Sequence, residues 1–154
     1  MTIEDDIAFL ERVPSLQQLG APALRILAIG AESRECYPGQ VLFSAGEAAD
    51  GAYIVQRGSF ALTSEGAGEG EVIAGPGTLL GETALVADTK RPATATAREH
   101  AAVMRISRAM FLKMLESYPE AAHRMRQVLA ARADQWAREM ENVRTSLAPG
   151  SKPQ

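Results

Sequence analysis

The sequence predicts an α+β protein, mainly β, in which a sandwich, jelly roll or barrel of short strands lies between helical segments. Residues 37–106 contain short apolar runs separated by glycine and proline, a pattern typical of strands joined by tight turns. Residues 1–35 and 107–147 instead space their apolar side chains three and four positions apart, as one face of a helix does. We therefore expect one domain over residues 1–147, with residues 148–154 as a disordered tail.

The N-terminal segment is expected to form two short helices. Ile7, Leu10 and Val13 recur at helical spacing ahead of a break at Pro14. A second apolar stripe follows Pro22, a residue that suits the first turn of a helix. We expect these helices to serve packing rather than chemistry.

The middle segment is expected to supply the strands. The candidate runs are QVLFSA, AYIVQRG, SFALTS, PATATA and AAVMRIS, separated by glycine, proline or polar residues. The glycine-rich stretch at 66–70 lies between two of these runs and opens no helix. It is therefore predicted to be a hairpin turn rather than a dinucleotide-binding loop.

The C-terminal segment is predicted to be helical again. Ser107 can cap a first helix, and a second helix is expected from Pro119 to about residue 146. At 1.5 Å per residue the second helix would be about 42 Å long, so it would extend beyond a small domain and need a partner for its apolar stripe. That stripe comprises Met125, Leu129, Arg132, Trp136, Met140, Val143 and Leu147.

Composition and charge limit the possible functions. Hydrophobic residues make up 46% of the chain, yet no apolar run approaches the ~20 residues that span a bilayer, and the acidic N-terminus does not resemble a signal peptide. Residues 1–97 carry 13 acidic and 6 basic side chains, whereas residues 98–154 carry 6 acidic and 10 basic ones. The acidic first part argues against sequence-independent binding of nucleic acid. We expect a cytoplasmic protein that does not enter the membrane.

Few residues could carry catalysis. His100 and His123 do not form a paired metal-ligand spacing, no Gly-x-Ser-x-Gly nucleophile motif occurs, and no Walker sequence is present. Cys36 is the only cysteine, so it cannot form an internal disulfide, and it is predicted to be a core or strand-edge thiol. We therefore expect no enzymatic activity, no metal and no catalytic cofactor.

The stretch GETALVADTKRPATATA places Glu82 and Arg91 nine positions apart among small residues. Gly81 allows a ligand to approach the backbone, and the amides of the turn that follows can form an anion-binding nest. Arg91, expected on the next strand, suits a phosphate, and the Glu82 carboxylate suits a sugar hydroxyl. The pair therefore predicts a nucleotide site, and a surface ion pair between the two side chains is the alternative.

The same stretch resembles the phosphate-binding cassette of cyclic nucleotide-binding domains, whose pattern is Gly-Glu-x-Ala/Gly-Leu, a short loop, then Arg-x-Ala-x-x-x-Ala. The earlier stretch YPGQVLFSAGEAADGAYIVQRGSFAL also resembles the first strands of that family. The matching cassette residues are Gly81, Glu82, Ala84, Leu85, Arg91, Ala93 and Ala97.

The resemblance implies a double-stranded β-roll, or jelly roll, of about eight strands with N-terminal helices and a long C-terminal helix. It also implies that Glu82 binds the ribose 2′-hydroxyl of a cyclic nucleotide, that Arg91 binds the cyclic phosphate, and that amides near Thr83 and Ala84 complete the anion nest. The long helix would cover the purine as a lid or pair with its counterpart in a homodimer. The expected site consists of Gly81, Glu82, Thr83, Ala84, Arg91, Pro92 and Ala93.

Pro92 departs from the family pattern, in which the residue after the arginine is often Ser, Thr or Ala. Proline has neither an amide hydrogen nor a side-chain donor, so this site has one donor fewer. In members that select cyclic GMP, a Thr or Ser at this position can reach both the phosphate and the guanine amino group. We therefore expect cyclic AMP to be preferred over cyclic GMP.

The sequence thus predicts a stand-alone regulatory sensor that binds a cyclic nucleotide and signals to a protein partner through its C-terminal helix. Only about eight residues follow that helix, so no DNA-binding domain and no direct DNA contact are expected, although a shortened form of a longer regulator would look similar. Two alternatives stay open. One is a transcriptional regulator similar to the catabolite activator protein that acts through a partner, and the other is a degenerate β-roll interaction module that binds no nucleotide.

Overall fold

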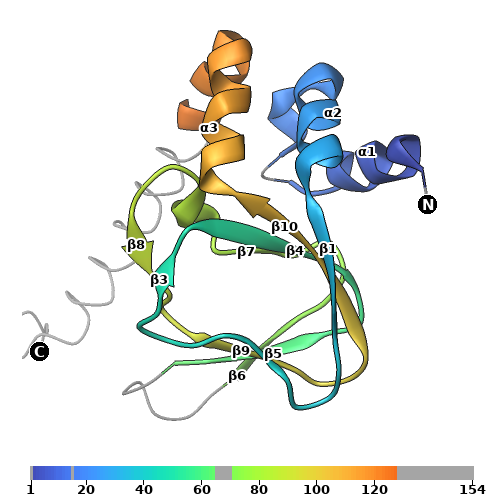
Figure 1. Cartoon of the computed structure of the whole chain (residues 1–154), viewed down its shortest axis with the longest axis vertical. Helices are drawn as coiled ribbons and strands as arrows, with labels where there is room; N and C mark the ends of the chain where they lie inside the picture. The colour runs from blue at the N-terminus through green and yellow to red at the C-terminus, as the bar shows by residue number, and fades with distance from the viewer. Residues whose placement is uncertain (1, 15, 65–70, 128–154) are drawn as a thin grey trace, which may run out of the picture.

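The chain forms two facing layers of strands, with helices covering one of them (Figure 1). The computed structural model describes residues 2–14, 16–64 and 71–127. The helices are α1 (Ile3–Glu11), η1 (Gln17–Leu19), α2 (Ala21–Gly30), η2 (Glu82–Leu85) and α3 (Arg108–Ser117), where η marks a 3₁₀-helix. The strands are β1 (Glu32–Cys36), β2 (Val41–Phe43), β3 (Ala48–Ala49), β4 (Gly51–Arg57), β5 (Phe60–Thr63), β6 (Glu71–Ala74), β7 (Leu79–Leu80), β8 (Thr89–Lys90), β9 (Thr94–Ala97) and β10 (Ala101–Ser107).

The strands build an antiparallel β-roll, which confirms the predicted fold class. One sheet has the order β1-β10-β4-β7 and the other β2-β9-β5-β6, while β3 pairs with β8. All of these pairs are antiparallel. The described part of the chain holds ten strands where about eight were expected. Strands β3, β7 and β8 have only two residues each, which is too short for a sequence pattern that would predict them.

Strand β4 is buried on both faces because it lies between the helices and the second sheet. Ala52 and Ile54 pack in the cluster that includes the helices, whereas Tyr53 and Val55 pack in the cluster between the two sheets. Successive side chains of a strand point to opposite faces. A strand covered on both sides is therefore apolar throughout, which explains the continuous run in AYIVQRG.

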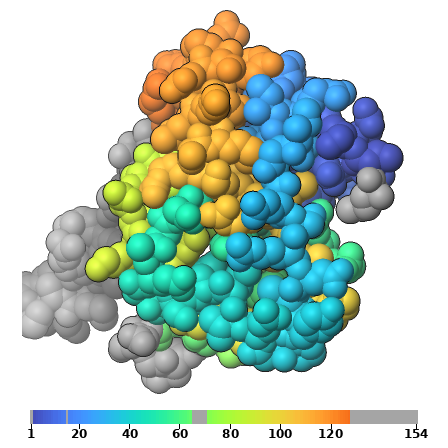
Figure 2. Space-filling view, in the orientation of Figure 1, coloured from blue at the N-terminus to red at the C-terminus, as the bar shows by residue number. Residues whose placement is uncertain are grey.

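In the helical layer α1 packs against α2, and α2 packs against α3, as the space-filling view also shows for α2 and α3 (Figure 2). Leu10, Leu24 and Leu27 are fully buried in this layer, which confirms the two predicted N-terminal helices. Residues 32–36, however, form β1, although the helical segment was expected to extend to residue 35. Their strand conformation comes from pairing with β10. Within the described ranges, no helix is both long and apolar enough to cross a bilayer.

The start and end of α3 agree with the sequence signals. The Ser107 hydroxyl accepts a hydrogen bond from the Met110 amide at 3.1 Å and so caps the helix. The helix ends at Ser117, and a further helix follows over residues 119–127. The remainder of the predicted long helix, its stripe beyond Met125 and the predicted tail lie outside the described residues, as does the predicted hairpin turn at 66–70.

Arg108, the first residue of α3, fixes the loop between η2 and β8. Its Nη1 donates to the Ala87 carbonyl at 3.1 Å, and its Nη2 donates to the Ala49 carbonyl and to the Asp88 carboxylate, each at 3.1 Å. Its backbone amide donates to the Asp50 carbonyl at 2.7 Å. One side chain therefore joins the C-terminal helices to the two segments that lead into β8 and β4.

Replacing Arg108 with methionine should lower the free energy of unfolding by about 1–2 kcal/mol, because several charge-assisted hydrogen bonds are lost while the apolar stem is kept. Urea denaturation measures the change, and hydrogen exchange at Ala87 should become faster. The matched variant is Asp88→Asn, which keeps both carbonyl acceptors and should cost less. Equal costs for the two variants would show that the carbonyl contacts do not hold the loop.

Candidate functional site

Arg91 was expected on a strand, but it lies in the connection between β8 and β9, directly after the last residue of β8. Its amide donates to the Glu47 carbonyl and its carbonyl accepts from the Gly46 amide, both at 2.8 Å. These two bonds hold the backbone while the side chain turns inward, where Arg91 is only 6% exposed. A surface ion pair with Glu82 does not fit a buried guanidinium.

Two aromatic rings contact the Arg91 guanidinium inside the roll. Its Cζ lies 4.4 Å from the centre of the Phe43 ring and 5.6 Å from that of Tyr53. Such cation–π contacts offset part of the lost hydration. Burial lowers the pKa of Arg91 from its ordinary value, and Tyr53, Asp50 and Glu47 oppose that shift. The site therefore holds a positive charge in an environment that disfavours it.

One nitrogen of this guanidinium has no acceptor. Within the described ranges, Nη1 of Arg91 is the buried side-chain nitrogen or oxygen without a hydrogen-bond partner. A buried donor left unpaired costs about 1–3 kcal/mol. An anionic oxygen is the acceptor that satisfies a guanidinium most strongly, so the geometry fits an anion receptor.

Gly81 brings the backbone against that nitrogen. A Cβ at this position would collide with Nη1 of Arg91. The residue also has φ 80° and ψ 36°, in the left-handed region that favours glycine, and this conformation starts η2. The Ala84 amide is used inside the turn, since it donates to the Gly81 carbonyl at 3.0 Å. The Thr83 amide comes before this first hydrogen bond of η2, and amides at the start of a helix have no acceptor within the helix. Of the two amides expected in the anion nest, the Thr83 amide is therefore the one that suits an anion.

The structure brings most of the predicted site residues into one cavity of about 330 Å³. Ala93 is the predicted residue that does not line it. The predicted residues that line the cavity are Gly81, Glu82, Thr83, Ala84, Arg91 and Pro92, and the others are Ala49, Leu79, Thr89 and Lys90.

The short helix η2 also faces the C-terminal helices. Glu82 lines the cavity and, with Leu85, Phe111 and Met125, also lines a small cleft on the other side. Leu85 and Phe111 belong to the same buried cluster. A change in the position of η2 would therefore reach both α3 and residues 119–127.

Sequence reasoning missed Lys90, Phe43 and Tyr53. Lys90 is exposed, lines the cavity and directly precedes Arg91. Together with Arg91 and the Glu82 carboxylate it gives these ionisable groups a net charge of +1, which matches the single negative charge of a phosphodiester. A second cation beside the cassette arginine was a visible signal, whereas only the fold brings Phe43 and Tyr53 to the guanidinium.

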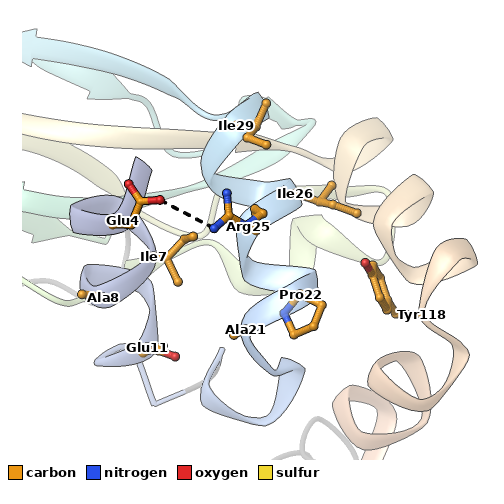
Figure 3. Close-up of a pocket in the computed structure, with 10 residues that line it drawn as sticks. All are labelled: Glu4, Ile7, Ala8, Glu11, Ala21, Pro22, Arg25, Ile26, Ile29 and Tyr118. Atoms are coloured by element: carbon orange, nitrogen blue, oxygen red, sulfur yellow. Dashed lines mark ion pairs between the residues drawn. The ribbon is translucent and has the colours of Figure 1, made fainter. Parts of the chain in front are cut away.

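A larger hollow, of about 530 Å³, lies between α1, α2 and Tyr118 (Figure 3). None of the predicted site residues lines it. Over the residues that the structure describes, no group of three or more His, Cys, Asp or Glu side chains could hold a metal ion. Volume alone therefore does not decide between the cavities, and the smaller one is the cavity that contains the buried guanidinium of Arg91.

Two curated proteins each match about 70% of this chain. The cAMP-dependent protein kinase regulatory subunit of Yarrowia lipolytica is 35% identical over 109 residues, which are 70% of this chain and 28% of that protein. The cyclic AMP receptor protein of Thermus thermophilus is 31% identical over 116 residues, which are 73% of this chain and 54% of that protein. The chain thus matches only part of the length of these curated relatives.

A solved structure of a cyclic nucleotide-binding-like protein from Brucella abortus is 39% identical, with a TM-score of 0.64. The match covers 73% of this chain and 98% of that chain. The family model of the cyclic nucleotide-binding domain matches residues 33–118, a range that includes every predicted site residue. The chain therefore belongs to the cyclic nucleotide-binding domain family.

Proposed function

We propose that this regulatory domain binds cyclic AMP in the cavity between η2 and β8 and passes the binding event to its C-terminal helices. The buried and unsatisfied guanidinium of Arg91 is the observation that carries the proposal. A folded protein gains nothing from an unpaired buried donor, whereas a phosphate oxygen would complete the hydrogen bonding of Nη1. The site is thus organised before the ligand arrives.

The other residues of the cavity suit the remaining parts of a cyclic nucleotide. The Glu82 carboxylate is an acceptor for the ribose 2′-hydroxyl, and the Thr83 amide is a donor at the start of η2. Lys90 supplies a flexible point charge at the rim. Arg91 and Lys90 together would bind the phosphate from the inside and from the rim.

Signalling would follow from the two faces of η2. One face lines the ligand cavity, and Leu85 on the other packs with Phe111 of α3. A ligand that binds one position of η2 more tightly would shift the equilibrium toward the matching position of α3. Arg108, which bonds to Ala87 just beyond η2, adds a second connection.

The protein would act as a non-catalytic regulator, as a homodimer in the cytoplasm, and would signal to a protein partner. The relatives named above are, by their names, a kinase regulatory subunit and a receptor protein. The helix expected to form the dimer contact was predicted to extend to about residue 146, and residues 128–154 lie outside the described part of the chain. The functions of the longer relatives extend beyond the matched domain and are not assigned to this chain.

Replacing Arg91 with methionine should weaken cyclic AMP binding by at least about a hundredfold, because charge-assisted bonds to the phosphate are lost. The free energy of unfolding should stay equal or rise by about 1 kcal/mol, since an apolar side chain of similar length replaces a buried charge beside Phe43. Isothermal titration calorimetry and urea denaturation measure the two effects.

The control is Arg126→Met, an exposed arginine on the helix after Pro119, which should change neither quantity. A folded Arg91→Met variant that binds as tightly as the parent would refute the phosphate role. A parent chain that binds neither cyclic AMP nor cyclic GMP would instead favour the degenerate interaction module.

Replacing Pro92 with threonine should test nucleotide choice. The parent should prefer cyclic AMP, because proline offers guanine neither an amide nor a hydroxyl. The variant regains both donors, so both nucleotides should bind more tightly, and cyclic GMP should gain more by ~0.5–1.5 kcal/mol. Competition titrations of parent and variant measure the ratio. A parent that prefers cyclic GMP contradicts the assignment, and an unchanged ratio places purine selection elsewhere.

A further inference from the structure

Helix α2 is apolar around nearly its whole circumference. Its sequence, APALRILAIG, contains Arg25 as the only polar side chain. Leu24 and Leu27 are fully buried on the inner face, while Ile29 is 64% exposed on the outer face. A helix that is apolar on all sides is normally covered on all sides. The outer face of α2 therefore has the composition of a contact surface.

This outer face forms the floor of the 530 Å³ groove shown in Figure 3. Helix α1 supplies Glu4, Ile7, Ala8 and Glu11, whose spacing of three and four puts them on one side of that helix. Helix α2 supplies Ala21, Pro22, Arg25, Ile26 and Ile29, and Tyr118 closes one end. Pro22 and Tyr118 also border a second hollow of about 470 Å³ that reaches Arg124, so the depression is elongated.

The rim of the groove is acidic. Helix α1 contributes two carboxylates to its lining, Glu4 and Glu11. Arg25, the one cation in the lining of the 530 Å³ hollow, already pairs with Glu4 at 3.6 Å, and Arg124 of the second hollow donates to the backbone carbonyl of Gln18. Within the described residues Glu11 belongs to no ion pair. The apolar floor and the Glu11 carboxylate together favour a partner with an apolar face and basic residues along the edge of that face.

We infer that the groove between α1 and α2 is a docking site for an amphipathic helix of a partner protein, with an apolar stripe and lysine or arginine along its edge. The walls are helices whose backbone groups bond within each helix, so an extended peptide would find no unpaired backbone to join. A helix satisfies its own backbone and can lay side chains into an elongated groove between two others. The inference does not rest on nucleotide binding.

The same charges argue against two other occupants. A second copy that packed this groove against its own counterpart across a two-fold axis would bring the carboxylates of the two copies together, and like charges at such a contact oppose association. A membrane surface with anionic lipids would be repelled in the same way. The basic helix is the occupant that the charges favour.

Two synthetic peptides of about 18 residues, five helical turns, test the inference. Both carry the same leucine stripe, and one has lysines where the other has glutamates. In fluorescence anisotropy titrations with the full chain, the lysine peptide should bind at least about tenfold more tightly than the glutamate peptide. Glu11→Lys, which suits the C-terminal end of α1, should remove or reverse this preference.

Ile29→Asn should weaken binding of the lysine peptide about tenfold, since it puts a polar group into the apolar floor. The matched control is Val72→Asn on β6, which is 65% exposed and lies outside the groove, and it should have no effect. Equal affinity for both peptides, no binding of either, or an unchanged Ile29→Asn variant would overturn the inference. Self-association or flotation with anionic vesicles that is lost in Ile29→Asn would also overturn it, by assigning the groove to a second copy or to a membrane.

Discussion

The buried positive charge of Arg91 is the constraint on which the rest of the site depends. Removing a guanidinium from water is costly unless hydrogen bonds and opposite charge replace the solvent. The chain provides partial compensation through the rings of Phe43 and Tyr53 and leaves Nη1 without an acceptor. A bound anion would supply the acceptor that this arrangement lacks.

Several otherwise separate features follow from this charge. Gly81 has no Cβ because Nη1 occupies the space that a side chain would need. Two backbone bonds, to Gly46 and Glu47, fix the chain on each side of the inward turn at Arg91. Strand β4 is buried on both faces, so Tyr53 can face the guanidinium while its neighbour Ile54 holds the helices. The surroundings of Arg91 and the helical layer therefore share one strand as well as η2.

Local chemistry explains what could be predicted from the sequence. The cassette from Gly81 to Arg91 was recognisable because its glycine, carboxylate and arginine have fixed spacing, and Ser107 because a helix cap depends on neighbouring residues. The strand β1 was missed because ESREC is polar and becomes a strand only by pairing with β10.

Contacts between distant segments explain what remained hidden. Phe43 lies far from Arg91 in the sequence, so no local pattern links the ring to the guanidinium. The two-residue strands β3 and β8 exist only through each other. Lys90 is the exception, since its position directly before Arg91 is visible in the sequence. The acidic rim of α1 was also visible, but the groove behind it requires the packing of α1 against α2.

NMR spectroscopy of the arginine side chains, with isotope-labelled arginine in the full chain, tests the central claim most directly. On addition of cyclic AMP, the account predicts that the Nη protons of Arg91 shift, exchange more slowly with water and show coupling to the ligand phosphorus across a hydrogen bond. The exposed Arg126 should remain unchanged. If cyclic AMP binds while the Arg91 resonances stay as they are in the free protein, the buried guanidinium is not the phosphate receptor.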